Sequence, residues 1–518
     1  HPRHNYFVPY FTEISDTLGA LIRDQMQQVE SKLDIDYPFS RLSLIEVPSQ
    51  YFAYRRRLGS QEERIQPEQL FLPENGAALN STDFKLALKQ NEERNRQQNR
   101  EVSLKEVQIF MFNRFLGELQ GNVRRGRFGG PGGNFPVTYS VVPFYYNYMT
   151  HFEAREYPLL STAFESFLKT ILVEQEPPFA RFFRGLLEAE KANLLLKEKS
   201  LAELLKDKEH FDQINNVVSV KSDFLFKKLI GHVGEEAFSS FLVEILNKHQ
   251  FKPIKMADFL SSLQERFGID FLSWIEPWRN NTELPGLILS DVTAYQVLDG
   301  NRTRYQVKFR LINEKKVDGL VSVQFRGGGR GGPGFGPPPV TIQRIVLIDP
   351  EQAKDVFILL DEEPRGMTID AVLAINLPLT FMHRIENIEL DTRAVPFDGE
   401  RILDALPQVT VSDEYIVDNE DPGFSIDSGE KKSRLQKILN LQKNDEEEYE
   451  AFRFYRPPAQ WRKTTFDDFY GRYIHSAHYI RSGRGDKTAT WRIELMQSGH
   501  YEIFAYNPRI QMRFGRGR

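Results

Sequence analysis

The sequence has no cysteine among its 518 residues. This absence excludes disulfides, cysteine-ligated zinc, iron–sulfur clusters and cysteine nucleophiles. The chain also lacks a basic surplus, because 67 Lys and Arg are outweighed by 72 Asp and Glu, for a net charge of −5. Binding to a phosphate backbone requires a positive surface, so nucleic acid is not expected as a partner. No apolar run reaches the roughly 18 residues that a membrane-spanning helix needs.

The common catalytic signatures are missing too. The sequence contains no His-Glu-x-x-His, no Gly-x-Ser-x-Gly, no P-loop and no dinucleotide-binding fingerprint. With ten His, a site of His and carboxylates is the one common metal centre left open, and the nearest cluster is His151, Glu153 and Glu165. A His at position i and a Glu at i+2 point to different faces of a helix, so a surface loop is the favoured interpretation. His475 and His478 lie in a β-rich region, where surface or stacking roles are favoured over metal ligation.

The spacing of apolar residues changes along the chain. A length of 518 residues predicts three or four domains. Residues 157–279 have helical spacing throughout, and beyond residue 287 the period changes to two, which is typical of strands. A last β unit is predicted from about 410 to 508. The individual strands are predicted at 41–48, 69–72, 305–312, 320–325, 342–348, 356–360 and 369–374.

Two Gly-rich segments, 121–133 and 326–339, have too few apolar side chains to order themselves. We predict both as mobile loops, the second joining two strands of a hairpin. The second segment resembles an RGG-type nucleic-acid segment, but three Arg, with Arg344 counted, are too few in an acidic chain to favour that interpretation. A third segment, 428–450, is charged and is predicted to be a helix inserted in the last β unit.

Aromatic residues are abundant, with 40 Phe and 20 Tyr. Such side chains serve cores and binding surfaces alike. For the cluster of Phe144, Tyr145, Tyr146, Tyr148 and Phe152 two interpretations stay open, the lining of a groove and ordinary core packing.

The order of several motifs resembles a known family. The chain has Tyr-Pro-Phe-Ser-Arg-Leu-Ser-Leu-Ile-Glu-Val-Pro at 37–48, Tyr-Pro-Leu-Leu-Ser-Thr-Ala-Phe-Glu-Ser-Phe at 157–167, and helical segments from 217 to 285. In this order they make residues 1–287 similar to the C-terminal part of the catalytic half of zinc aminopeptidases of the alanyl-aminopeptidase type. The resemblance implies a thermolysin-like unit in which Glu165 stands at the position of the third zinc ligand.

The departures from that family's pattern decide the predicted function. Val142 and Tyr146 stand where the family has its two zinc-binding His, and Pro143 stands at the general-base Glu. Gln66 replaces the carboxylate that grips the substrate's amino group, and Ser219 replaces the Tyr that stabilises the oxyanion. Without two imidazoles there is no zinc-bound water of lowered pKa, and without the Glu no base takes its proton. The resemblance therefore implies a catalytically silent unit, for which no cofactor, zinc included, is expected.

A second resemblance covers residues 411–508. The motifs Tyr-Ile-Val-Asp-Asn-Glu-Asp-Pro-Gly-Phe at 415–424, Ala-Thr-Trp at 489–491 and Ser-Gly-His-Tyr-Glu-Ile-Phe at 498–504 resemble the golvesin/xanthan-lyase C-terminal β-sandwich. We expect Trp461 and Trp491 to fill this sandwich and Gly499 to turn the chain into its last strand. The resemblance implies a binding or adhesion module of a secreted or surface protein.

Together the two parts are similar to the extracytoplasmic part of Bacteroidetes ABC-transporter permease/aminopeptidase fusions. We therefore predict a multidomain α+β protein with three domains. These are a mainly helical, degenerate aminopeptidase-like domain at 1–287, a β-sandwich linker domain at 288–405, and a golvesin/xanthan-lyase-like β-sandwich at 406–518. The location that the resemblance implies is the periplasm or cell surface, with a membrane tether upstream of His1.

The predicted function is that of a non-catalytic protein that binds a peptide or protein partner, as the ectodomain of an ABC-transport system. One alternative is an active metallopeptidase that uses His151, Glu153 and Glu165 as atypical ligands. Another is a surface protein that binds cell-envelope polysaccharide by stacking rings at 473–479 on sugars. The candidate binding residues are Glu165, His151, Tyr145, Tyr146, Tyr473, His475 and His478.

Overall fold

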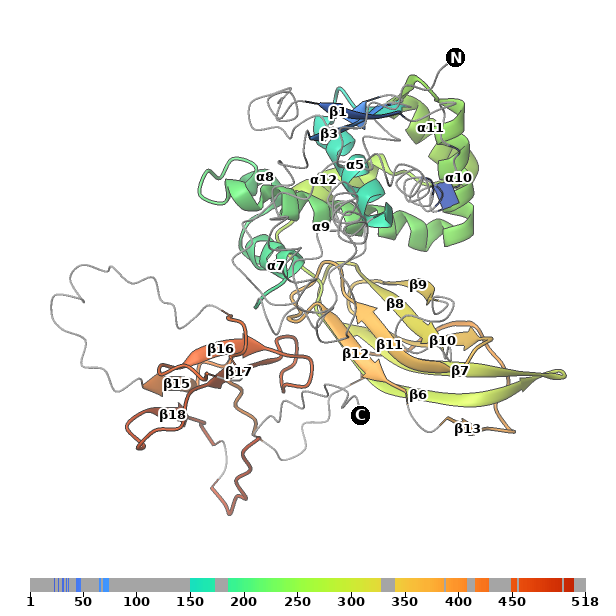
Figure 1. Ribbon diagram of the computed structural model, residues 1–518. Helices are drawn as coiled ribbons and strands as arrows, with labels where there is room; N and C mark the ends of the chain where they lie inside the picture. The colour runs from blue at the N-terminus through green and yellow to red at the C-terminus, as the bar shows by residue number, and fades with distance from the viewer. Residues whose placement is uncertain are drawn as a thin grey trace, which may run out of the picture. The chain divides into compact units, whose positions relative to one another are not determined.

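The fold is multidomain α+β (Figure 1). A computed structural model describes residues 150–172, 185–327, 341–385, 388–407, 415–427, 449–453, 456–495 and 498–506, with short strands and single positions before residue 74. The chain divides into two compact units: unit 1 is His1–Gln175 with Val233–Ser273, and unit 2 is Glu176–His232 with Trp274–Arg518. The three-domain division drawn from the sequence stays a prediction.

Several predicted features lie outside the described residues. They are Val142, Pro143, Tyr145 and Tyr146, the loop 121–133, residues 328–340 of the second loop, and residues 428–448 of the predicted inserted helix.

Unit 1 combines short strands with helices. Its elements are β1 (Ser43–Val47), β2 (Ile65–Gln66), β3 (Gln69–Pro73), β4 (Thr150–Glu153), α5 (Pro158–Leu172), α10 (Glu235–Lys248), β5 (Lys252–Lys255) and α11 (Met256–Phe267). Strands β1 and β3 confirm the predictions at 41–48 and 69–72, and they pair in parallel. Strand β5, which pairs in parallel with β4, interrupts the stretch that was predicted to be helical throughout.

Phenylalanine rings form the core of unit 1. Phe152 on β4 stacks on Phe164 of α5 with ring centroids 5.0 Å apart and meets Phe259 of α11 edge to face at 5.2 Å. Phe259 continues the cluster to Phe241 and Phe271. Offset and edge-to-face contacts of this kind contribute about 0.5–1.5 kcal/mol each beyond the burial of their area. Phe152 is therefore part of the core of unit 1.

The helices of unit 2 precede its sheets. They are α7 (Glu188–Glu198), α8 (Leu201–Leu204), a 3₁₀ turn (Phe211–Gln213), α9 (Ile214–Val233) and most of α12 (Leu272–Asn280). Helix α8 begins with a capping box, because the Ser200 hydroxyl accepts from Glu203 N and the Glu203 carboxylate accepts from Ser200 N at 2.8 Å. Helix α9 is tied to α12 by Trp278, whose Nε1 donates to the carbonyl of Lys221 at 2.7 Å.

Two antiparallel sheets form a sandwich in unit 2. The five-stranded sheet has the order β13-β6-β7-β10-β14 and the four-stranded sheet has the order β12-β11-β8-β9. The strands are β6 (Leu287–Asp299), β7 (Arg302–Asn313), β8 (Gly319–Gly327), β9 (Thr341–Ile348), β10 (Gln352–Leu360), β11 (Pro364–Asp370), β12 (Thr380–Arg384), β13 (Glu389–Leu390) and β14 (Gly399–Ile402). Among these described strands of the sandwich, β13 alone pairs in parallel, with β6.

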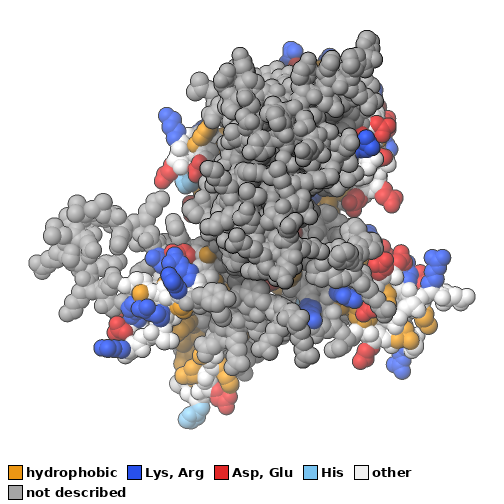
Figure 2. All heavy atoms as spheres, viewed as in Figure 1, with side chains coloured by type: hydrophobic (Ala, Val, Ile, Leu, Met, Phe, Trp, Pro, Cys, Tyr) orange, Lys and Arg blue, Asp and Glu red, His pale blue; other side chains and the backbone are white. Residues whose placement is uncertain are grey.

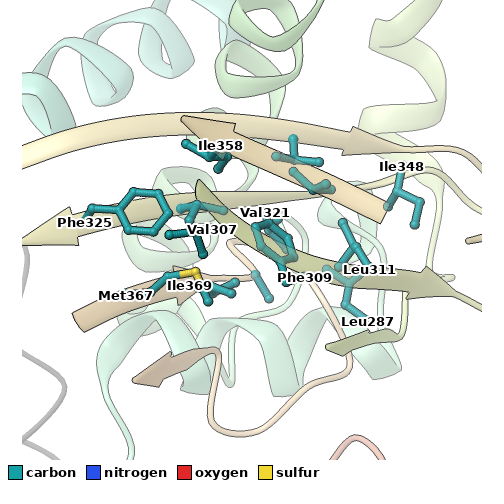
Figure 3. Packing of buried hydrophobic residues seen from close by; sticks show 14 of the residues in the cluster. Leu287, Val307, Phe309, Leu311, Val321, Phe325, Ile348, Ile358, Met367 and Ile369 are labelled. Atoms are coloured by element: carbon teal, nitrogen blue, oxygen red, sulfur yellow. The ribbon is translucent and has the colours of Figure 1, made fainter. Parts of the chain in front are cut away.

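The core of the sandwich follows the period of two. Alternate residues of β7 and β8 are buried and face one another across the two sheets, as Figure 3 shows for Val307, Phe309 and Phe325. The predicted strands from 305 to 360 are confirmed as β7 to β10, and the segment from 326 joins the antiparallel neighbours β8 and β9 as a hairpin connection. The strand predicted at 369–374 is wrong in its bounds, because β11 ends at Asp370.

The last part of unit 2, residues 415–506, holds two small antiparallel sheets and is called the terminal module here. Strand β15 (Phe424–Asp427) pairs with β18 (Thr488–Trp491), and β16 (Arg462–Thr465) pairs with β17 (Ser476–Tyr479). The expectation that Trp491 fills a sandwich is wrong, because its side chain is 56% exposed. None of the helices in the described part of the chain is long and apolar enough to cross a membrane.

Candidate functional site

Polar side chains hold the terminal module together around Glu420. Its carboxylate accepts from Lys463 Nζ at 2.7 Å, from the Tyr449 hydroxyl at 3.2 Å, and from the hydroxyl of Ser476. Burial, with the neighbouring carboxylate of Glu420, raises the pKa of Asp418 to about 6. Because the partners of Glu420 come from β16, β17 and the segment before β16, the network fixes these parts relative to one another.

A row of rings covers the strands of this module. The Phe424 ring lies 4.9 Å from that of His478 and 5.1 Å from that of Trp491. Burial lowers the pKa of His478 to about 4, and the charge of Lys463 acts in the same direction. His478 is therefore neutral near pH 7, and it packs as an aromatic ring does.

Apolar side chains are exposed beyond this row. Ile503 is 94% exposed and Phe504 is 85% exposed. Tyr415 and Tyr501 pack edge to face at 5.9 Å, and the Tyr506 hydroxyl donates to the carbonyl of Asp468 at 2.9 Å. We call the following residues the terminal apolar surface: Tyr415, Ile416, Tyr470, Tyr501, Ile503, Phe504 and Tyr506. Hydrophobic side chains are visible over the terminal module at the lower left of Figure 2.

Such a surface has a physical meaning. Single exposed apolar residues are ordinary in soluble proteins, but a contiguous group marks a place where another molecule binds. The two contacts made by Tyr501 and Tyr506 hold the ends of the segment 501–506 on the module. The side chains of Ile503 and Phe504, which lie between these ends, are left in water. A molecule that binds over these two side chains would remove their apolar area from water.

The predicted site residues in the rest of the chain fall on several elements. His151 lies on β4 and Glu165 on α5, and both elements belong to unit 1. Gln66 ends β2. Ser219 lies in α9 and is half-buried.

Three of the predicted binding residues make contacts inside the terminal module or with the sandwich. The Tyr473 hydroxyl donates to Glu314 at 2.5 Å, and burial with that carboxylate raises the pKa of Tyr473 to about 12. His475 packs on Phe381 with centroids 5.4 Å apart, and His478 packs on Phe424. The structure thus places these rings against neighbouring side chains of the same unit, and their stacking on sugars stays a prediction.

One group of side chains could ligate a metal by distance. Asp207, Glu209 and His210 bring ligating atoms within 4.8 Å of one another, which no other group does in the described ranges. Asp207 already binds Lys199 Nζ at 2.5 Å and His210 Nδ1 at 3.0 Å. The hydrogen bonds from Lys199 and then His210 hold the pKa of Asp207 well below its usual range. The charge of this carboxylate is therefore balanced without a metal ion. Asp207, Glu209 and His210 were not predicted as metal ligands from the sequence.

Comparisons with known proteins find distant similarity among solved structures. No family model matches the chain, and no curated protein matches it. Among solved structures it is similar to Legionella pneumophila aminopeptidase A, crystallised in complex with aspartic acid, with 12% identity and a TM-score of 0.31. The match covers 70% of this chain and 34% of the Legionella chain. The chain thus spans about a third of that enzyme, and similarity at this level carries no argument about activity.

The sequence alone did not indicate the terminal apolar surface. The motif Ser-Gly-His-Tyr-Glu-Ile-Phe at 498–504 was expected to turn at Gly499 into the last strand of the sandwich, but residues 498–506 form no strand. The signal that was present is the density of large apolar residues near the end of an otherwise polar chain. Alternation shows which side chains share a face, but it does not show whether another layer covers that face.

Proposed function

We propose that this chain is a non-catalytic, aminopeptidase-like protein that binds a peptide or protein partner outside the cytoplasm. In this proposal it is the ectodomain of an ABC-transport system, tethered to the membrane by a segment outside this chain. The observation that carries the binding role is the exposure of Ile503 and Phe504 within the terminal apolar surface. Burying such side chains against a partner gives about 25 cal/mol for each Å² removed from water.

The chemistry of the surface favours a polypeptide over a polysaccharide. Besides its rings it includes the aliphatic side chains of Ile416 and Ile503, which are both exposed. Aliphatic side chains contact apolar side chains well, but they offer neither a ring face nor a hydrogen bond to a sugar. Cell-envelope polysaccharide is therefore the alternative partner.

The non-catalytic part of the proposal rests on the residues at the family's active-site positions. Gln66 carries a neutral amide, which cannot balance a substrate's ammonium as a carboxylate does. Ser219 has a short side chain in a helix and lacks the reach of a tyrosine hydroxyl. With Val142, Pro143 and Tyr146 at the positions of the zinc ligands and the general base, ligand and proton acceptor are lost together.

Selection of a displayed peptide library on the purified chain tests the binding role. The matched counter-selection uses the double variant Ile503→Ser and Phe504→Ser, which removes apolar area from the terminal surface only. The control is Val395→Ser, because Val395 is 81% exposed but lies between β13 and β14. We expect peptides that bind the wild type and the control but not the double variant. Peptides that bind all three proteins alike would contradict the proposal, and binding on a glycan array alone would favour the polysaccharide alternative.

Hydrolysis of aminoacyl anilides, measured with and without added zinc, tests the non-catalytic part. We expect no turnover above the rate in buffer. Zinc-dependent turnover that is lost in Glu165→Ala would instead establish the alternative of an active metallopeptidase with atypical ligands.

A further inference from the structure

The segment 491–495, with the sequence Trp-Arg-Ile-Glu-Leu, begins at the last residue of strand β18 and runs on from it without regular secondary structure. All five residues are exposed. Apolar residues at 491, 493 and 495 alternate with the charged residues Arg492 and Glu494, which is the pattern of a strand that buries one face. Neither charged side chain makes an ion pair with any residue that the structure describes.

One edge of β18 has no paired strand among the described residues. Of the described strands, only β15 pairs with β18. Arg492 N donates to the carbonyl of Gly423 at 2.8 Å, one position beyond the pair Phe424 and Trp491. Backbone groups alternate in direction along an antiparallel strand, so the groups of Arg492 face β15 and those of Trp491 face the open edge. An open edge with exposed apolar side chains is a template on which another strand pairs.

The charges of Arg492 and Glu494 favour one pairing register, in which the partner strand is the same segment of a second copy. If two copies of the segment pair antiparallel about Ile493, Arg492 of each copy lies opposite Glu494 of the other. The same symmetry places Trp491 opposite Leu495. Opposite charges and apolar pairs that face each other directly across strands are both stabilising. Centring the pair on Arg492 or on Glu494 would instead place like charges face to face, so the two-fold about Ile493 is the favoured register.

We propose that a second copy of this chain binds at the open edge of β18, with residues 491–495 of the two copies pairing antiparallel about Ile493. Charged residues on an edge ordinarily prevent pairing with other strands. Here Arg492 and Glu494 disfavour pairing with strands of a different sequence. In the antiparallel pair of two copies, each charge instead lies opposite a charge of the other sign. The inference goes beyond the proposed function and is independent of it, because it uses residues outside the terminal apolar surface.

Sedimentation equilibrium of the full chain tests the proposal. We expect the wild type to be a dimer, and each single reversal, Arg492→Glu or Glu494→Arg, to raise the dissociation constant about tenfold or more. An equimolar mixture of the two single variants should form a heterodimer, because both charge pairs are then restored. The double variant carrying both reversals should form a homodimer again. Arg484→Glu, an exposed reversal in the same module, should leave the dimer unchanged.

The other outcomes overturn the proposal. The proposal is refuted if the wild type stays monomeric at all accessible concentrations. It is also refuted if both single reversals leave the dimer intact. A mixture that does not recover the dimer shows that the reversals act otherwise than through the pairing of residues 492 and 494. If the dimer forms as expected while Ile503→Ser with Phe504→Ser still binds selected peptides, only the proposed function fails. A monomer that binds selected peptides and loses them on Glu494→Arg assigns the edge to a different protein.

Discussion

Replacing the buried Lys221 by methionine should stabilise the protein. Lys221 lies in α9 with 4% of its surface exposed, and burial lowers its pKa to about 8 from the ordinary 10.5. The charge of Asp318 acts against this shift but does not cancel it. The difference, 10.5 minus 8, is 2.5 units, which at about 1.4 kcal/mol per unit corresponds to roughly 3 kcal/mol. Methionine is also unbranched, is one heavy atom shorter and carries no charge, so Lys221→Met should raise the free energy of unfolding by about 1–3 kcal/mol at pH 7.

The pH dependence of this gain has a definite sign. Between pH 8 and 10.5 the unfolded chain holds a proton on Lys221 that the folded chain has lost, so the contribution of this lysine to stability rises with pH. Below pH 8 both states are protonated and the cost of burial is complete. The advantage of Lys221→Met should therefore be largest near pH 7 and should shrink toward pH 10.

Urea unfolding of the two proteins from pH 7 to pH 10 measures the effect. Tryptophan fluorescence reports on this place directly, because Trp278 donates to the carbonyl of Lys221. Lys206→Met is the matched control, since Lys206 is exposed, and it should change stability by less than about 0.5 kcal/mol. If Lys221→Met destabilises the protein by an amount that does not vary with pH, the ammonium makes a favourable buried interaction and the reasoning is refuted.

Two further substitutions test other contacts of unit 2. Glu190→Ala should lower the free energy of unfolding, measured in urea, by about 2–3 kcal/mol. The buried Glu190 carboxylate accepts from the backbone N–H of Leu187 at 2.9 Å and of Leu379 at 3.3 Å. Its loss leaves these buried N–H groups unpaired. An unchanged denaturation midpoint would show that water reaches these groups. Gly423→Ala should weaken the pairing of β15 and β18, because a Cβ at Gly423 would meet the backbone carbonyl of Arg492. Hydrogen exchange at the backbone amide of Arg492 should become at least about tenfold faster. Protection of this amide equal to that in the wild type would contradict the prediction.

The sequence predicted the strands of the sandwich better than their boundaries. Strands β7 to β10 were recognised because alternate residues of each belong to the apolar core between the two sheets, which imposes a period of two. Strand β6 was missed. Its pairing with β7 shifts register between Ser290 and Thr293, and such a bulge moves the apolar residues from one face to the other and hides the period. The short strand β5 was missed because four residues are too few to show a period.

The functional residues were harder to predict than the strands. Tyr473, His475 and His478 were chosen by residue type, and the structure shows that each ring has a neighbour within its own unit. Conversely, Ile503 and Phe504 were expected as part of a last strand after Gly499, yet both are exposed and residues 501–506 form no strand. Both differences have one cause. The sequence shows the chemistry of a side chain, whereas the burial of that side chain depends on contacts between segments far apart in the chain. In the resemblance to zinc aminopeptidases, the positions of the two zinc-binding His and of the general base are at 142–146, which lie outside the described residues.

Titration of one labelled peptide from the selection, followed by fluorescence anisotropy, tests the central claim most directly. The claim is that this protein binds a polypeptide partner through the terminal apolar surface. The account predicts that Ile503→Ser with Phe504→Ser raises the dissociation constant by about tenfold or more, whereas Val395→Ser leaves it unchanged. Equal dissociation constants for the wild type and both variants would contradict the account.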